Sequence, residues 1–170
     1  MIFAGHLGPS CFGQVRGPKT SRCSDCFRNT CYHRPVATLN TIVPCFIVEN
    51  LQASLDFYQS KLGFEIAHKG GGNGDGNEDD FWAFVRRDGV MVSLKAIAPE
   101  IHPQPNHSRH EWARWDAYIH TSDPDLLYEE YVSRSVPMHK RLADTEDGLR
   151  AFEVIDNNGY VLCFGRPREL

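Results

Sequence analysis

The sequence predicts an α+β domain built from two copies of a βαβββ unit. Three observations support this fold class: two strand-then-helix segments with matching caps, two hairpins with matching turn residues, and a linker rich in Pro and His between the halves. A repeated unit of this kind determines the topology of a whole domain.

The first unit spans about residues 41–98. Residues 41–48 (TIVPCFIV) are β-branched and apolar and predict a buried strand, in which Pro44 indicates an edge position or a bulge. Asn50 fits an N-cap and Gly63 a C-terminal stop for the helix that follows. The apolar face of this helix has residues at helical spacing: Leu51, Leu55, Tyr58 and Leu62. Residues 64–69 predict a strand, 70–80 a flexible acidic loop, and 81–87 with 90–96 a hairpin around Asp88-Gly89.

The second unit spans about residues 113–167, after the linker at 99–112. Residues 115–121 predict a strand, and Asp123 caps a helix that has Pro124 at its first position. The apolar face of that helix is formed by Leu127, Tyr128, Tyr131 and Val132. Residues 138–143 predict a strand, 146–148 a turn, and 149–155 with 160–164 a hairpin around residues 157–159.

Two numerical offsets relate the units. A shift of 73 places Asn50 on Asp123 and Tyr58 on Tyr131, and a shift of 70 places residues 84–85 on 154–155 and 88–89 on 158–159. The alternative is a generic α+β domain in which two strand-helix segments occur by chance. The agreement of caps, turns and apolar faces favours the repeat.

Residues 1–39 differ from the rest of the chain. They are rich in Gly, Pro, Ser, Arg and Cys without helical or strand periodicity, which predicts a poorly ordered extension before a domain at 40–168. Four of the six cysteines lie in this segment, so the cysteines do not form a disulfide framework across the fold. This distribution predicts a reducing, cytoplasmic environment.

Composition excludes several classes of function. Hydrophobic residues make up 41% and charged residues 24% of the chain, as in soluble globular proteins. The net charge of −4 and the absence of a basic stripe argue against a nucleic-acid partner. No apolar run reaches the roughly 18 residues that would span a bilayer, and no secretory signal is evident, so no membrane partner is expected.

Three groups of metal-ligand residue types have simpler explanations. Cys23, Cys26, Cys31 and His33 suggest zinc, but their spacing is not standard, and an unstructured Cys-rich segment is favoured. Residues 75–79 (DGNED) suggest calcium, but the required Gly and Glu positions hold Asp80 and Arg86, which favours a solvated loop. The linker histidines have neither helical nor strand spacing, which favours exposed loop residues: His102, His107 and His110.

Two segments resemble a known family. VENLQASLDFYQSKLGFEI (48–66) is similar to the opening strand end, helix and strand of a vicinal oxygen chelate module, and LRAFEVIDNNGYVLCFGRP (149–167) is similar to the closing hairpin of the second module. The second segment is particularly similar to the bleomycin-resistance and glyoxalase-like branch of the glyoxalase, bleomycin resistance protein and dioxygenase superfamily. The resemblance covers about residues 41–167. It implies two βαβββ modules whose curved mixed sheets surround a cleft.

The resemblance also implies four equivalent metal-ligand positions, one early in the first strand and one in the last strand of each module. The repeat offsets place them at Val43, Asp116, Ser93 and Cys163. A transition metal in an open site needs about three good N, O⁻ or S⁻ ligands, and only Asp116 and Cys163 qualify. We therefore expect no metal, no cofactor and no catalytic residues, and glyoxalase or dioxygenase chemistry is not expected.

The resemblance then implies a homodimer that binds a small molecule and confers antibiotic resistance by sequestering it. Strand alternation and the offsets predict the ligand-binding residues: Cys45, Trp82, Phe84, Ser93, Trp115, Asp116, Tyr118, Glu153 and Cys163. Aromatic walls with a few acids suit a flat, cationic, amide-rich ligand such as a bleomycin-like glycopeptide. Two alternatives stay open: a metal-dependent enzyme of the same superfamily, and a binding module for an unknown metabolite.

Overall fold

A computed structural model describes residues 39–71 and 80–168. The predictions for the N-terminal extension, for a zinc site at residues 23–33 and for a calcium loop at 75–79 fall on residues outside these ranges. The domain limits at 39/40 and 168 remain predictions for the same reason.

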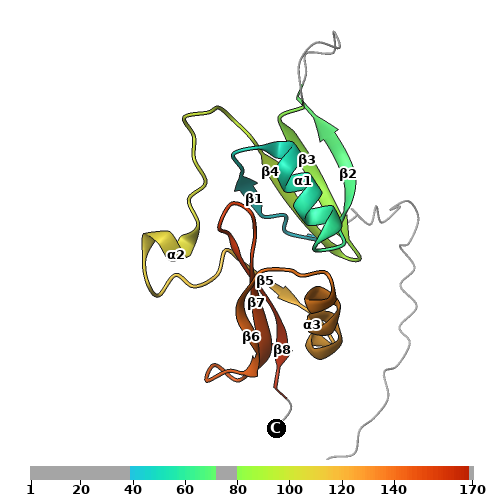
Figure 1. Ribbon diagram of the computed structural model, residues 1–170, viewed down its shortest axis with the longest axis vertical. Coiled ribbons are helices and arrows are strands. Elements are labelled where there is room, and N and C mark those ends of the chain that lie inside the picture. The colour runs from blue at the N-terminus through green and yellow to red at the C-terminus, as the bar shows by residue number, and fades with distance from the viewer. Residues whose placement is uncertain (1–38, 72–79, 169–170) are drawn as a thin grey trace, which may run out of the picture. The chain divides into compact units, whose positions relative to one another are not determined.

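Two modules follow one another along the chain, each with one helix and one four-stranded sheet (Figure 1). The first comprises β1 (Cys45–Ile47), α1 (Leu51–Ser60), β2 (Glu65–Gly70), β3 (Trp82–Arg87) and β4 (Val90–Lys95). The second comprises β5 (Ala117–His120), α3 (Pro124–Ser133), β6 (Met138–Asp144), β7 (Leu149–Ile155) and β8 (Val161–Pro167). A short helix in the linker, α2 (Asn106–Arg109), was not predicted. The α+β class with two βαβββ units is confirmed.

Both sheets have the same mixed topology, with strand orders β1-β4-β3-β2 (sheet A) and β5-β8-β7-β6 (sheet B). β1 runs parallel to β4 and β5 runs parallel to β8, whereas the other neighbours are antiparallel. Pro44 directly precedes β1, which lies at the sheet edge, as its sequence predicts. No helix among the described residues is long and apolar enough to cross a membrane.

The predicted helix starts are confirmed by their cap geometry. The Asn50 side chain accepts a hydrogen bond from the Ala53 N–H at 2.8 Å, and that of Asp123 accepts one from the Leu126 N–H at 2.9 Å. Pro124 occupies the first turn of α3, where its missing N–H has no cost. The two predicted turn glycines Gly63 and Gly159 have φ of +73° and +86°, a region that favours glycine.

The predicted offset of 70 residues relates β4 to β8, but it is wrong for β3 and β7. Ser93 pairs with Phe84, whereas its equivalent Cys163 pairs with Glu153, so β3 maps onto β7 by 69 residues and not by 70. The reason is one extra residue in the β7–β8 turn. The corrected offset places Phe84 on Glu153 and Val85 on Val154, and it preserves the face on which each side chain lies.

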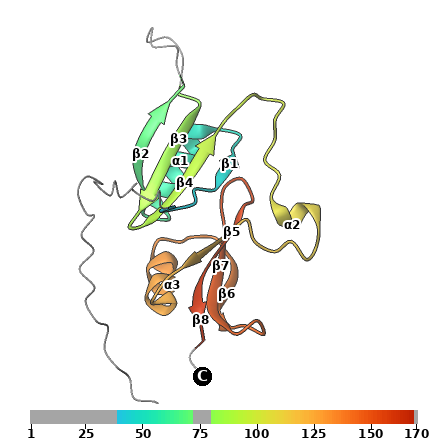
Figure 2. The ribbon, with the colours of Figure 1, turned by 180° about the vertical axis from the view of Figure 1, so that it is seen from behind.

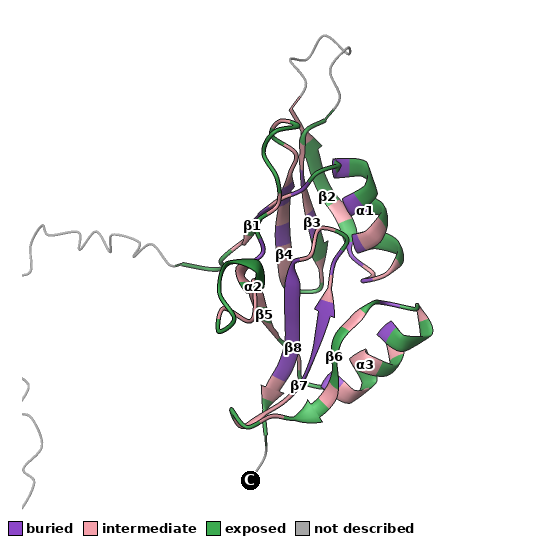
Figure 3. Cartoon of the chain, turned by 60° about the vertical axis from the view of Figure 1, so that its left-hand side comes forward, coloured by how far each residue is buried: buried purple, intermediate pink, exposed green. Residues whose placement is uncertain are grey.

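The core lies between each helix and one face of its sheet. Ala83, Val85, Val92 and Leu94 are fully or almost fully buried beneath Leu55 and Tyr58 of α1. In the second module the rings of Tyr131, Phe152 and Phe164 contact one another at 5.4–5.8 Å. Figure 2 shows the opposite face of sheet A, which no helix covers, and Figure 3 shows buried residues concentrated on the central strands β7 and β8.

The modules are joined because the hairpin turn of each packs against the helix of the other. At the first contact Arg87, at the end of β3, donates to the Leu62 carbonyl at 2.6 Å and to Glu130 of α3 at 2.7 Å. The Tyr131 hydroxyl also donates to the Leu62 carbonyl, at 3.3 Å. The hydrogen bond from Arg87, acting against burial, lowers the pKa of Glu130.

The second contact uses the β7–β8 turn and α1. The Tyr58 hydroxyl donates to the Asp156 Oδ2 at 3.1 Å, and the backbone N–H groups of Asn158 and Tyr160 donate to its Oδ1 at 2.8 and 2.9 Å. The Tyr160 hydroxyl donates to the Ile47 carbonyl at 2.8 Å, and its ring stacks on Phe46. Burial raises the pKa of Asp156 to about 6, although these hydrogen bonds act to lower it.

The raised pKa of Asp156 predicts a specific pH dependence of stability. The folded state binds this proton more tightly than the unfolded state, so the contribution of Asp156 is fully present below about pH 4 and is lost as the pH rises through about 6. The free energy of unfolding of the wild type relative to Asp156→Asn should therefore fall by about 2 kcal/mol between pH 4 and pH 7. Urea unfolding at both pH values measures it. The control Asp88→Asn removes an exposed carboxylate, and a difference between wild type and Asp88→Asn that changes as much with pH would contradict the assignment to Asp156.

Gly165 is predicted to tolerate no side chain. A Cβ at this position would lie 2.5 Å from the Ala151 Cβ and 2.8 Å from the Arg150 carbonyl oxygen, so β7 and β8 would have to separate. Gly165→Ala should lower the free energy of unfolding by about 1–3 kcal/mol. Gly89→Ala adds the same methyl group in open space and should change it by less than about 0.5 kcal/mol. Thermal and urea unfolding of the two variants measure the difference, and equal effects would disprove the close-packing argument.

Candidate functional site

The face of sheet A that points away from α1 carries a row of aromatic and small polar side chains. Cys45, Ser93 and Phe84 are neighbours across β1, β4 and β3, and Trp82 lies two residues along β3 on the same face. The Trp82 ring contacts Phe84 at 5.4 Å and His68 of β2 at 5.1 Å. We call this surface the open face of sheet A. Ala83 and Val85 of β3 are fully buried against α1. Because side chains alternate along a strand, Trp82 and Phe84 point to the opposite face.

The equivalent open face of sheet B has a row that runs from Tyr118 through Cys163 and Glu153 to Lys140. Trp115, just before β5, contacts the Tyr118 ring at 5.9 Å. The Tyr118 hydroxyl donates to the Gly165 carbonyl at 3.0 Å, which fixes the ring along β8. The two open faces therefore occupy equivalent places in the two modules, because Cys45 pairs with Ser93 as Tyr118 pairs with Cys163.

Glu153 is a buried carboxylate with an unequal environment at its two oxygens. Its Oε1 accepts hydrogen bonds from the Trp115 indole at 2.8 Å and from Arg114 and Lys140 at 3.3 Å each. Its Oε2 is buried and has no hydrogen-bond donor within the described residues, and the His139 Nε2 lies 3.7 Å away. Burial acts to raise the pKa of Glu153, but the indole hydrogen bond and the Lys140 charge outweigh it and lower the pKa. Glu153 is therefore ionised at neutral pH.

Two other arginines on the hairpins have partners of their own. Arg86 pairs with Glu65, and Arg150 pairs with Asp125 and Asp144. Sequence reasoning missed Arg114, His139 and Lys140 as neighbours of Glu153, and His68 as a neighbour of Trp82. Lys140 lies opposite Glu153 only because β6 carries register shifts on both sides of it, and such bulges have no clear sequence signal here.

Cys163 is a buried thiol. Burial, and secondarily the negative charge of Glu153, raise its pKa to about 12, so that it stays protonated at neutral pH. A protonated thiol is a poor nucleophile. The surroundings of Cys163 therefore do not activate it for attack on a substrate.

Asp116 has a structural task. Its Oδ1 accepts from the Asn106 N–H and its Oδ2 from the Val161 N–H, both at 2.8 Å. The Asn106 side chain donates to the Trp115 carbonyl, so Asp116 and Asn106 together attach the linker to sheet B. Asp116 also lines, with Cys45, a hollow of about 560 Å³ between β1 and the linker.

The four implied metal-ligand positions do not fit a metal. Val43 has no donor atom, Ser93 is a weak ligand, and Asp116 already accepts a backbone hydrogen bond at each oxygen. The Cys163 thiol is then the one good donor that remains among the four positions, which is too few for an open metal site. In the described part of the chain no three His, Cys, Asp or Glu residues are grouped so as to hold an ion. We therefore derive no metal-dependent step.

The nine predicted ligand-binding residues fall into two groups. Cys45, Trp82, Phe84 and Ser93 lie on sheet A, and Trp115, Asp116, Tyr118, Glu153 and Cys163 lie on or beside sheet B. The structure brings each group together on its own sheet. Among the described residues no hydrogen bond, ion pair or ring contact joins one group to the other, so the site remains a prediction. The linker histidines are exposed, as expected, and His107 lies 2.8 Å from the Gly159 carbonyl oxygen.

Comparisons with known proteins agree with this fold. A family model described as the glyoxalase/bleomycin resistance protein/dioxygenase superfamily matches residues 38–164. A search of curated proteins gives no match.

Solved structures show the same fold at low sequence identity. The bleomycin-binding protein from bleomycin-producing Streptomyces verticillus, solved with copper(II)-bleomycin, has a TM-score of 0.54 and 21% identity, covering 79% of this chain and 100% of that one. TnmS3, an antibiotic binding protein from Streptomyces sp. CB03234, has a TM-score of 0.53 and 20% identity, covering 77% and 99%. A glyoxalase/bleomycin resistance protein/dioxygenase from Nocardioides has a TM-score of 0.54 and 17% identity, covering 79% and 88%. With most of its length matched by the family model and with two βαβββ modules, the chain belongs to the glyoxalase/bleomycin resistance protein/dioxygenase superfamily.

Proposed function

We propose that this protein binds a flat, amide-rich small molecule of the bleomycin type and confers resistance by sequestering the molecule without converting it. The observation that carries the proposal is the aromatic open face of sheet A. Trp82 and Phe84 are only half-buried there, and no helix covers them. Large half-exposed rings on a rigid sheet provide stacking surface for a planar ligand.

The chemistry of the second face supports binding rather than catalysis. Cys163 is protonated and therefore not prepared to attack a substrate, and the Oε1 of Glu153 already accepts hydrogen bonds from Trp115, Arg114 and Lys140. The charge of Glu153 is also balanced by Arg114 and Lys140. This balance weakens the expectation of a strongly cationic ligand and leaves stacking and amide hydrogen bonds as the main attractions.

We propose that the site is completed in a homodimer. The two open faces are equivalent in the two modules, and among the described residues no hydrogen bond, ion pair or ring contact joins their predicted ligand-binding residues. Two copies would therefore pair face A of one with face B of the other in two clefts. The structural neighbours that bind bleomycin or another antibiotic support this role. The cytoplasmic location expected from the cysteine distribution would place the protein where an intracellular drug acts.

Calorimetry with bleomycin, copper-loaded and metal-free, tests the proposed function. The wild type should bind at least one form, and mass spectrometry should recover the drug unchanged. Trp82→Ala should weaken binding about tenfold, because a central aromatic stacking surface is lost. The control Val132→Ala truncates a side chain of α3 that is 51% exposed and lies on neither open face, and it should bind as the wild type does. The absence of binding heat with both forms, or altered drug, would refute the proposal.

The homodimer is predicted to have twice the chain mass of 19.3 kDa. Sedimentation equilibrium measures the mass in solution. Titration with drug should give one site per chain, because each of two clefts uses one face from each copy. A monomer that binds drug with full affinity would contradict the shared cleft.

Elemental analysis of the purified protein tests the alternative function. A stoichiometric transition metal would favour a metal-dependent enzyme.

A further inference from the structure

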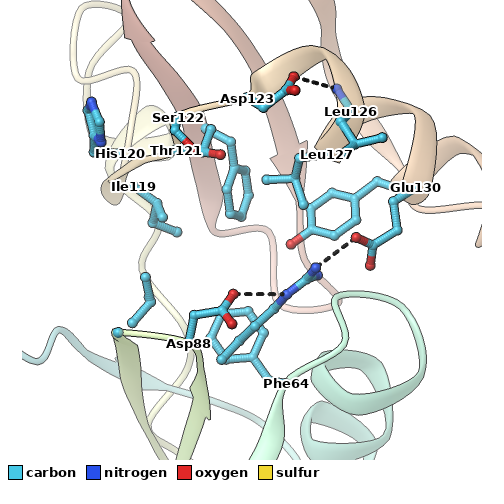
Figure 4. A pocket seen from close by; sticks show the side chains of 15 residues that line it. Phe64, Asp88, Ile119, His120, Thr121, Ser122, Asp123, Leu126, Leu127 and Glu130 are labelled. Carbon is cyan, nitrogen blue, oxygen red and sulfur yellow. Dashed lines mark hydrogen bonds and ion pairs between the residues drawn. The ribbon is translucent and has the colours of Figure 1, made fainter.

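A second cavity lies away from both open faces, on the helical side of the contact between the β3–β4 turn and α3. It has a volume of about 560 Å³, within the range of small-molecule sites. Its wall comes from the end of β5, from α3 and from the first module, as Figure 4 shows. The apolar part of the wall includes Phe64, Val90, Ile119, Leu126, Leu127 and Phe164.

The repeat explains why this space exists. At the equivalent contact in the other half, the β7–β8 turn fills the space between the end of β1 and α1. There the Asn158 Oδ1 accepts from the Glu49 N–H at 3.1 Å, and the Asn158 Nδ2 donates to the Ser54 Oγ at 2.8 Å. Asn157 donates to the same oxygen at 3.2 Å. The Asn158 carboxamide therefore fills the space between β1 and α1.

The β3–β4 turn cannot do the same, because it is one residue shorter and consists of Asp88 and Gly89. The Asp88 side chain is 91% exposed, and a Cβ at Gly89 would have no atom within 4 Å. Along the chain, Glu49 corresponds to Ser122 and Ser54 corresponds to Leu127, by the offset of 73. Among the described residues no group accepts the Ser122 N–H, whereas the equivalent Glu49 N–H donates to Asn158. The Ser54 hydroxyl, which accepts from Asn158, is replaced here by the apolar side chain of Leu127.

We infer that this cavity binds a small, uncharged molecule with an apolar body and a carboxamide or carbonyl oxygen. The oxygen accepts from the Ser122 N–H, as the Asn158 oxygen accepts from Glu49, and the apolar body packs on Leu126, Leu127 and Ile119. Three carboxylates, Asp88, Asp123 and Glu130, outnumber the one guanidinium, Arg87, and therefore disfavour an anion. Arg87 is held by Glu130 and the Leu62 carbonyl and is not offered to a ligand.

Three probes of one size and shape test this inference: benzamide, benzoate and benzamidine. Amide proton and nitrogen shifts of the full chain are followed by NMR during titration. Benzamide should bind with a Kd on the order of 1 mM and shift the Ser122 amide together with neighbours on β5 and α3. Benzoate should bind at least tenfold more weakly. Benzamidine has no acceptor and should not shift the Ser122 amide downfield.

Two exposed apolar residues of α3 provide a matched pair of variants. Leu126 is 64% exposed and lines the cavity, whereas Val132 is 51% exposed and does not line it. Leu126→Ser should weaken benzamide binding roughly threefold to tenfold, and Val132→Ser should leave it unchanged. Equal weakening by both variants, tighter binding of benzamidine or benzoate than of benzamide, or shifts confined to the open faces would overturn the inference. Because this cavity is separate from the open faces, failure here leaves the bleomycin experiment unaffected.

Discussion

The structure depends on reciprocal contact between two repeats. A βαβββ unit buries one face of its sheet under its own helix, but the ends of that helix and strand need partners from elsewhere. Each module supplies such partners to the other: Arg87 of the first module pairs with Glu130 of α3, and the Tyr160 hydroxyl of the second module donates to the Ile47 carbonyl. The equivalent tyrosines Tyr58 and Tyr131 take part in opposite contacts. The two modules are therefore held together by polar contacts that cross between them, in addition to the stacked rings of Phe46 and Tyr160.

This arrangement determines where a ligand can bind. Each helix covers one face of its sheet. On the opposite faces Trp82 and Phe84 are half-buried, whereas Glu153 and Cys163 are buried. Trp82 and Phe84 on one face, and Tyr118 and Glu153 on the other, stand on central or paired strands whose backbones are fixed by ladder hydrogen bonds. Rigid strands hold such side chains in place with little loss of entropy on binding. The fold thus holds these side chains in a fixed arrangement.

The two halves diverge through small changes at equivalent positions. One additional residue in the β7–β8 turn lets Asn157 and Asn158 reach Ser54, whereas the shorter β3–β4 turn leaves a cavity beside α3. Because of this extra residue, β4 maps onto β8 by 70 residues but β3 maps onto β7 by 69. Phe84 and Glu153 are therefore equivalent and lie on equivalent faces of the two sheets. On these equivalent surfaces sheet A is aromatic, whereas sheet B carries a paired carboxylate, so the two halves offer different chemistry to one ligand.

The sequence by itself determined the features that depend on neighbouring residues: the caps Asn50 and Asp123, the turns at 88–89 and 157–159, the order of strands and helices, and the unsuitability of Val43 and Ser93 as metal ligands. These features are local, because caps, turns and ligand chemistry act within a few residues. Only the tertiary structure decided the orientation of Trp82 and Phe84, the partners of Glu153, the task of Asp116 and the cavity beside α3. Each of these depends on register, bulges or turn length across residues distant in sequence, which one chain read alone does not encode in any local pattern.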